Sequence, residues 1–313
     1  MNKSYKEIYD ELIGKKFQMA IIGYSPFKGV YEYRGYSHQA DKNALEDIVN
    51  LIIDDMVFYA FSEDEILKLN EQMDLLKDLR AAAQYAYVQR LPGRKNDKTD
   101  GIMGEVLLDI FIQMASPNTK KLTARAKHTE IKSKKEITGY DALYFIKENT
   151  EISLWLGQAK AGQKKYCKDN IIKDLNAKYT KDYFADTVFY IADRNDAPEL
   201  EELLCEINKR CLEAQLHKWS KKEKVEKVLD ILKTKQVKIK IPCLISYSRD
   251  IYSDKKKLKQ YVQLEVQEIK KEFDSKTFLV EMGLDYEIIF YIMPVENVDF
   301  IRNKIIELKE DAI

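Results

Sequence analysis

Near its middle the chain reads Gly139-Tyr-Asp-Ala-Leu-Tyr-Phe-Ile146 and, after the polar residues 147–151, Ile152-Ser-Leu-Trp-Leu-Gly-Gln-Ala-Lys160. Short apolar runs bounded by turn residues are typical of strands, so we expect an antiparallel hairpin. Its second strand is apolar on both faces, as a buried strand is, but it ends with Gln158 and Lys160 on one face. The hairpin would bring Asp141, at the head of the first strand, to a similar level. The sequence therefore predicts a polar site at the end of a buried hairpin.

Helices and strands alternate on both sides of this hairpin. We expect further strands at residues 17–23, 122–132, 187–192, 237–246 and 286–293. Helical spacing of apolar residues predicts helices at residues 5–13, 41–61, 62–79, 101–115, 257–273 and 298–309, and another that opens at 161–165. Residues 199–233 are expected to form a long helical region with an interruption near Trp219-Ser220. Asp41 is the expected N-cap of the second helix, and Ser62 with Glu65 forms a capping box for the third. The alternation predicts an α/β fold with a mixed central sheet flanked by helices. Residues 1–98 are expected to form a mainly helical region packed on a core of residues 99–313.

The charge of the chain is balanced overall but uneven along its length. It has 313 residues, of which 45% are apolar, so it can bury a large core, and we expect one large domain or two closely packed domains. The 52 basic residues cancel the 52 acidic ones, yet residues 118–182 carry 15 basic and eight acidic side chains. This basic segment includes the hairpin and suits contacts with phosphates. A solvated lysine face is the alternative, and charge alone leaves it open.

Several function classes lack their sequence signatures. The four cysteines form no Cys-x-x-Cys pair, no segment resembles a signal peptide, and no apolar run approaches the length of a membrane span. We therefore expect a cytoplasmic protein with no membrane association. Glycine-rich phosphate loops are also absent, so any ATP-driven motor would have to lie on another protein.

The polar residues near the hairpin fit the needs of phosphodiester hydrolysis. That reaction uses a divalent cation held by oxygen ligands, a cation that steadies developing negative charge, and a groove that tolerates a polyanion. Asp141 and Glu105, an acid on the helix at 101–115, are the candidate carboxylates, and Lys160 is the candidate cation. The expected phosphate contacts follow directly in the chain: Lys164, Lys165 and Lys168.

Each of these residues alone has a plainer interpretation. Glu105 could serve only as a partner of the helix dipole, Asp141 as a turn residue, and Lys160 as a strand-end lysine that reaches solvent. What favours a nuclease site is their joint occurrence in this order beside a basic segment.

The same residues carry a resemblance to a known group of proteins. A helix with Gly104-Glu105, a strand that opens with Gly139-Tyr140-Asp141 and a strand that ends with Gln158-Ala159-Lys160 resemble the PD-(D/E)xK nuclease superfamily. More narrowly, Gly-Tyr-Asp-Ala-Leu and Leu-Trp-Leu-Gly-Gln-Ala-Lys resemble the DUF1837 family, which includes HamA of the Hachiman anti-phage systems. The motifs cover residues 101–168. The resemblance implies a restriction-endonuclease-like core, metal-dependent cleavage of DNA, and a superfamily 2 helicase (HamB-like) as a partner that controls the nuclease.

The resemblance also implies roles for individual residues. Mg²⁺, for which Mn²⁺ can substitute, would be held by Glu105, Asp141, Gln158 and the carbonyl of Ala159, while Lys160 assists the attacking water. This chain departs from the family at Gln158, where Glu is usual. The site would therefore hold one negative charge fewer and bind Mg²⁺ more weakly, although Gln-x-Lys also occurs in active Mrr-like nucleases. A catalytically silent DNA-binding or regulatory subunit of the same complex is the rival, and a purely structural adaptor for a helicase is a weaker one.

Overall fold

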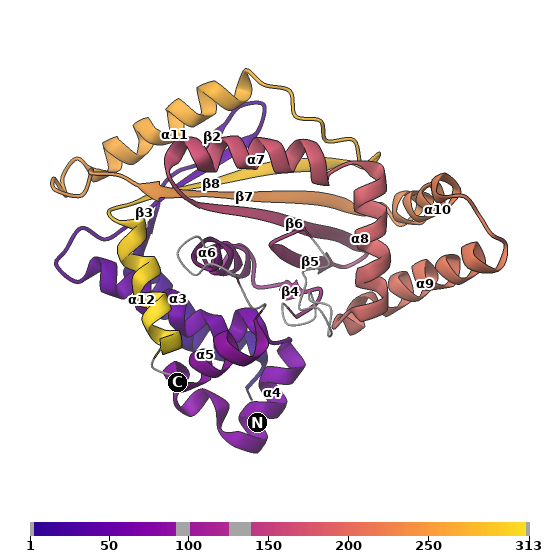
Figure 1. Cartoon of the computed structure of the whole chain (residues 1–313), viewed down its shortest axis with the longest axis horizontal. Coiled ribbons are helices and arrows are strands. Elements are labelled where there is room, and N and C mark those ends of the chain that lie inside the picture. Colours follow the sequence, from indigo (N-terminus) through magenta and orange to yellow (C-terminus); the bar gives the residue numbers. More distant parts are fainter. Residues whose placement is uncertain (1–2, 92–100, 125–138, 311–313) are drawn as a thin grey trace.

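A mixed sheet forms the centre of the computed structural model, which describes residues 3–91, 101–124 and 139–310 (Figure 1). Seven of its eight strands follow one another in the order β1-β3-β8-β7-β6-β5-β4, and β2 pairs with β3 beside this path. The strands are β1 (Ile21–Gly23), β2 (Phe27–Lys28), β3 (Glu32–His38), β4 (Thr119–Lys121), β5 (Ala142–Glu148), β6 (Glu151–Gly162), β7 (Lys238–Ser248) and β8 (Tyr286–Val295). The predicted mixed α/β fold is confirmed.

The predicted hairpin consists of β5 and β6. The two strands pair antiparallel, with Ala142 opposite Gly157 and Glu148 opposite Glu151, and Asn149 turns the chain with a positive φ of 55°. On its other side β6 pairs in parallel with β7, which in turn pairs in parallel with β8. The strand that carries Gln158 and Lys160 is therefore internal to the sheet, as its apolar sequence predicted.

Helices cover both faces of the sheet. On one face, α7 (Lys164–Lys178) and α11 (Leu258–Asp274) lie against the strands, while α8 (Lys181–Arg194), α9 (Glu201–Leu216) and α10 (Lys221–Thr234) pack on one another at the end of the sheet and share the same core (Figure 1). On the other face, α3 (Ala44–Ala60), α6 (Ile102–Gln113) and α12 (Val298–Glu310) lie against the strands, and α1 (Tyr5–Tyr9), α4 (Glu63–Met73) and α5 (Leu79–Tyr85) complete this helical layer. The sheet thus lies between two hydrophobic cores. Successive side chains at the end of β6 point to opposite faces and therefore meet helices of different layers.

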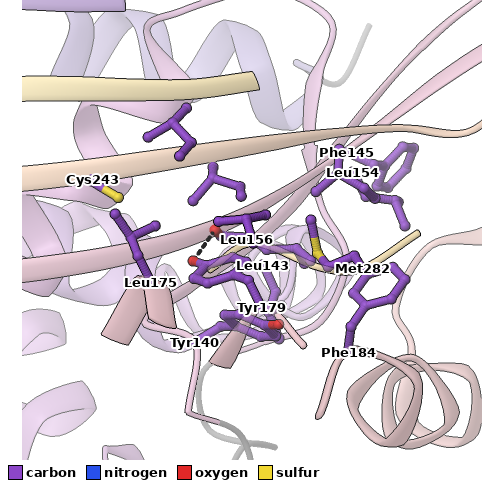
Figure 2. Close-up of a cluster of buried hydrophobic side chains, with 14 of the residues drawn as sticks. Tyr140, Leu143, Phe145, Leu154, Leu156, Leu175, Tyr179, Phe184, Cys243 and Met282 are labelled. Atoms are coloured by element: carbon purple, nitrogen blue, oxygen red, sulfur yellow. Dashed lines mark hydrogen bonds between the residues drawn. The ribbon is translucent and has the colours of Figure 1, made fainter. Parts of the chain in front are cut away.

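The first core holds the hairpin in place beside α7 (Figure 2). Leu143, Leu156 and Leu175 are buried together with Tyr140 and Tyr179. The hydroxyl of Tyr179 donates a hydrogen bond to the Leu156 carbonyl at 2.7 Å, and that of Tyr140 donates to the Lys178 carbonyl at 2.6 Å. Burying a leucine such as Leu156 contributes about 2 kcal/mol. These contacts anchor the residues that flank Asp141 and Gln158.

The second core brings α6 close to β6. A Cβ on Gly104 would lie 3.4 Å from the Ala161 Cβ and 3.5 Å from the Ala159 Cβ. On the strand, a Cβ on Gly157 would lie 2.8 Å from a Leu108 methyl carbon. Small residues on both sides therefore let the first turn of α6 approach the end of β6.

The N-terminal third contributes to the sheet as well as to the helical layer. Helix α3 is buried along most of its length, and β3 pairs in parallel with β8, with Glu32 opposite Ile289. Residues 32–38 thus extend the sheet that contains the hairpin. The division at residues 98 and 99 remains a prediction.

Three expected strands differ from the structure. Residues 15–20 are helical (α2, Lys15–Ala20), because they continue the helical run that starts at Tyr5, and only Ile21–Gly23 forms a strand. Residues 187–192 lie within α8, where Thr180 caps the helix and Phe184, Val188 and Ile191 face the core at helical spacing. β-branched and aromatic residues had favoured a strand, but burial along one helical face decides.

The third difference concerns residues 122–132. Strand β4 ends at Lys121, and the chain then turns towards residues 194–196, where the Ala124 amide donates to Asp196 Oδ2 at 2.9 Å. Residues 125–132 lie outside the described part of the chain. The Leu122 amide still donates to the Leu143 carbonyl at 3.0 Å, so the expected neighbour of β5 is present but starts earlier.

The expected helices are present with shifted ends. Ser62 and Glu65 form the predicted capping box, but α4 stops at Met73, because Asp74 adopts a left-handed conformation with φ 51°. Asp41 is not the N-cap of α3, which begins after Asn43, and its carboxylate instead accepts a hydrogen bond from the Asn43 amide. Within the described residues, no helix has the length and apolar character needed to cross a membrane.

Candidate active site

Asp141 lies at the start of β5, and two hydrogen bonds join it to β6. Its amide donates to the Gly157 carbonyl at 2.9 Å, and its Oδ2 accepts a hydrogen bond from the Ala159 amide at 2.8 Å. Since the amide and carbonyl of one strand residue project to the same edge, the Ala159 carbonyl also faces the side of Asp141. The carboxylate and this carbonyl therefore lie on the same side of β6, and a shared metal remains a prediction.

Glu105 reaches the same place from the first turn of α6. It is 5% exposed, and its Oε2 accepts a 2.7 Å hydrogen bond from the Tyr59 hydroxyl. The same hydroxyl lies 3.5 Å from the Asp141 carbonyl oxygen. Tyr59 of α3 thus links the helix acid to the strand acid, and the close packing of Gly104 against β6 makes this possible.

Lys160 lies between two acids. Its Nζ is 2.7 Å from Asp174 Oδ2 and 3.8 Å from Asp141 Oδ2. Burial opposes the positive charge, but attraction from Asp141, Asp174 and Glu105 outweighs this effect and raises the pKa of Lys160 above its usual value. The side chain therefore stays an ammonium at neutral pH.

Gln158 is fully buried and makes two hydrogen bonds of opposite sense. Its Nε2 donates to the Gly139 carbonyl at 2.7 Å, and its Oε1 accepts from Lys178 Nζ at 2.9 Å. Lys178 can only donate and a carbonyl can only accept, so these partners determine the orientation of the amide. Lys178 also lies 3.2 Å from Asp174. Gln158 thus belongs to a chain of contacts that runs through Lys178 and Asp174 to Lys160.

The two acids and Lys160 open into a cleft of about 420 Å³. Its lining consists of Gly101, Glu105, Asp141, Ala159, Lys160, Ala161, Gly162, Gln163, Tyr166 and Arg302. The structure therefore brings Glu105, Asp141, Ala159 and Lys160 together as predicted, whereas the Gln158 side chain lies beneath them in the protein interior.

Several residues of this region carried no signal in the sequence. Tyr59, Asp174, Lys178 and Arg302 come from α3, α7 and α12, and they meet the hairpin only through packing of distant elements. The spacing of Asp174 and Lys178, four residues apart on a helix that follows β6, is the one local pattern that could have indicated an ion pair.

The predicted phosphate contacts lie on the first two turns of α7. Lys164 Nζ is 2.7 Å from both Glu265 and Glu268, and Lys168 pairs with Glu272, all on α11. Lys165 is exposed. Two of the three lysines therefore face acids of the neighbouring helix, and a polyanion would have to compete with those acids for them.

The donors in the cleft suit a hard divalent cation. Among the described residues, no three His, Cys, Asp or Glu side chains gather closely enough to hold a metal ion by themselves. Mg²⁺, however, commonly uses one or two carboxylates and completes its shell with water. Glu105, Asp141 and Ala159 all line the cleft, so two carboxylates and a backbone carbonyl are the candidate oxygen ligands.

Comparisons with known proteins identify the family of the chain. Neither the curated proteins nor the solved structures contain a match. The family model of HamA matches residues 24–308, which include both strands of the hairpin, the helix with Glu105 and the helix with Arg302. Because this match covers nearly the whole chain, the protein belongs to the HamA family.

Proposed function

We propose that this protein is a metal-dependent DNA nuclease, the cleaving subunit of a Hachiman anti-phage defence complex, and that a partner helicase controls it. Membership of the HamA family supports the defence role. We further propose that β5, β6 and α6 are the core of a PD-(D/E)xK-type site, in which the helix acid, the strand acid and the strand lysine have the order of that motif.

The observation that carries the proposal is the meeting of Glu105, Asp141 and Lys160 in one cleft. The first two come from a helix and a strand that are 36 residues apart in sequence, and one tyrosine hydroxyl contacts both. Both acids are largely buried, and hydrogen bonds from Tyr59 and from the Ala159 amide offset part of their lost hydration. Their opening into a shared cleft is what a binding role for a cation explains.

The chain's own residues would perform distinct tasks. Glu105, Asp141 and the Ala159 carbonyl would hold Mg²⁺ or Mn²⁺, which when bound polarises the phosphate and acidifies a water molecule. Tyr59 orients Glu105, and the Ala159 amide orients Asp141. Lys160, kept charged by its acidic neighbours, would orient the attacking water or steady negative charge on the phosphate. Gln158 is fully buried and does not line the cleft, and its oxygen accepts a hydrogen bond from Lys178, so it would act on the site through Lys178 rather than as a ligand.

A catalytically silent DNA-binding or regulatory subunit is the second candidate. The engagement of the Gln158 amide by Lys178 and Gly139 favours it, because the amide oxygen then does not face the cleft, and the acids among the described residues of its lining are Glu105 and Asp141. A weaker metal site would bind little Mg²⁺ at physiological concentrations. This candidate predicts no specific metal binding and a DNA affinity that Asp141→Asn leaves unchanged.

Plasmid digestion in Mg²⁺ tests the proposal, with the wild type compared with Asp141→Ala and Lys160→Ala. We expect both substitutions to reduce cleavage at least about a hundredfold, because each removes a charge at the reacting centre. Lys256→Ala, which removes an exposed lysine far along the chain, is the matched control and should cleave like the wild type. Equal cleavage by all four proteins would contradict the proposal. Calorimetric titration with Mg²⁺ then separates the nuclease from its silent rival.

A further inference from the structure

Arg302 reaches the candidate cleft from α12, an element outside the predicted motif. Its Nη2 donates to the Ala161 carbonyl at 2.6 Å, two residues beyond Ala159 on the open edge of β6. Its Nε is buried and, among the described residues, has no hydrogen-bond acceptor. The nearest acid on its own helix, Asp299, lies 3.5 Å from Nη1 and is largely exposed to solvent. The guanidinium is thus fixed in direction and only weakly neutralised.

A glycine separates this guanidinium from an aromatic ring. Gly162 has φ +148°, and a Cβ at that position would lie 3.6 Å from Arg302 Nη2 and 3.7 Å from Tyr166 Cδ1. The backbone there is one that residues with a side chain rarely adopt. Tyr166 lines the same cleft and is 54% exposed. The end of β6 therefore leaves a gap with a cation on one side and an exposed ring on the other.

We propose that Arg302 and Tyr166 form a nucleotide-binding subsite next to the reacting centre, in which the guanidinium binds a DNA phosphate that is not cleaved and the ring stacks on a base. This inference rests on the proposed nuclease function and deepens it. Guanidinium groups bind phosphate oxygens with directed hydrogen bonds, and bases stack on tyrosine with little regard to sequence. Glu105 and Asp141 repel a polyanion, and Arg302 adds to Lys160 a second cation in the same cleft that attracts the strand.

The alternative is that Arg302 only caps the Ala161 carbonyl. The salt dependence of DNA binding separates the two, because each phosphate contact releases counterions whereas an internal cap does not. Losing one contact lowers the slope of log K against log salt by about 0.7 to 0.9.

The experiment measures binding of a short fluorescein-labelled DNA strand by anisotropy, with Ca²⁺ in place of Mg²⁺, over a range of salt concentrations. We expect Arg302→Gln to lower the slope by about one contact and Arg302→Lys, which keeps the charge, to retain it. Lys304→Gln removes a charge from the same helix, where Lys304 pairs with Glu307, and should leave the slope unchanged. A folded Arg302→Gln protein with the wild-type slope would overturn the phosphate contact.

Tyr166 provides a second and independent test. We expect Tyr166→Leu to weaken binding about tenfold at every salt concentration without changing the slope, and Tyr166→Phe to retain the wild-type affinity. Unchanged affinity of Tyr166→Leu would overturn the stacking role, and a wild type that binds no DNA would overturn the subsite altogether. If the predicted changes occur but the plasmid assay shows no dependence on Asp141, the subsite stands and the nuclease proposal fails. If plasmid cleavage depends on Asp141 but the Arg302 and Tyr166 variants bind DNA like the wild type, the subsite is overturned and the nuclease proposal stands.

Discussion

The two hydrogen-bond partners of Gln158 require a side chain that can both donate and accept. It must donate to the Gly139 carbonyl and accept from Lys178 at the same time, and a carboxylate cannot donate. Glu at this position would set a carboxylate oxygen against the Gly139 carbonyl. The partners of residue 158 therefore favour an amide over a carboxylate.

A substitution tests this interpretation. We expect Gln158→Glu to lower the free energy of unfolding by about 1–3 kcal/mol at pH 8, because a buried acceptor loses its donor. The loss should shrink at pH 5, where a protonated Glu can donate again. Urea unfolding at both pH values measures it, with Gln215→Glu on an exposed face of α9 as the control. A more stable Gln158→Glu protein at pH 8 would show that the Gly139 contact is dispensable.

Asp174 is expected to act on Lys160. The pKa of Lys160 is raised by Asp141, Asp174 and Glu105 against the effect of burial. A lysine whose pKa is raised by folding contributes stability that is fully present below its unfolded pKa and is lost as the pH rises through the folded value. In Asp174→Asn the attraction is weaker while the burial remains, so the pKa of Lys160 falls.

The unfolding free energy of Asp174→Asn should therefore decline at a lower pH than that of the wild type as the solution is made alkaline. Urea titrations at a series of pH values from neutral to about pH 12, a range that passes through the ordinary pKa of lysine, measure this difference. Asp182→Asn, in which an exposed acid of α8 is replaced, serves as the control. If the unfolding free energies of the wild type and of Asp174→Asn change with pH in parallel, Asp174 does not raise the pKa of Lys160.

At the scale of elements, the approach of α6 to β6 determines whether the two acids can share a cleft. A Cβ added to Gly104 would already lie in van der Waals contact with the Cβ atoms of Ala159 and Ala161. We expect Gly104→Leu to push the first turn of α6 away from the strand, to weaken Mg²⁺ binding by at least tenfold and to cost about 1–3 kcal/mol of stability through overpacking. Calorimetry and urea unfolding measure the two effects.

The matched control for this change lies on the same helix layer. Ala83 of α5 is also fully buried, and Ala83→Leu should cost similar stability while leaving Mg²⁺ binding intact, because α5 does not line the cleft. Loss of metal binding in both variants would mean that overpacking in general, and not the position of α6, disturbs the site.

The hairpin, the helix with Glu105 and the capping box at Ser62 were predictable, since each depends on a local pattern of apolar spacing and polar ends. The prediction of a strand at 187–192 is wrong, because its β-branched residues also fit one face of a helix. Tyr59, Asp174 and Arg302 could not be predicted, because they reach the site through packing of α3, α7 and α12. Sequence thus locates the motif residues, and the residues that orient them emerge only from tertiary contacts.

At the scale of the whole molecule, the N-terminal region and the C-terminal strand form one sheet. Tyr33 of β3 is fully buried, its ring lies 5.3 Å from that of Phe290, and its hydroxyl donates to Asp274 at 2.8 Å. A substitution that weakens the packing of β3 on β8 should therefore also lower the stability of the hairpin, although β8 and β7 separate β3 from β6 in the sheet.

We expect Tyr33→Ala to lower the unfolding free energy by about 3–5 kcal/mol, the usual cost of removing a large aromatic side chain from a core. The fluorescence of Trp155 on β6, recorded in a Trp219→Phe background, should report the same shift in its urea midpoint. Tyr286→Ala, at a half-exposed position of β8, should shift it far less. An unchanged Trp155 midpoint in Tyr33→Ala would mean that residues 1–98 unfold as a separate unit.

The pairing of β3 with β8 has a consequence for synthesis on the ribosome. β3 emerges early, but its parallel partner is translated more than 200 residues later, and Arg302 later still. A nascent chain can therefore hold the hairpin and Glu105 long before the sheet is closed and the cleft is lined on its α12 side. If the cleft does cut DNA, the order of translation itself delays a harmful activity in the host until α12 has been made.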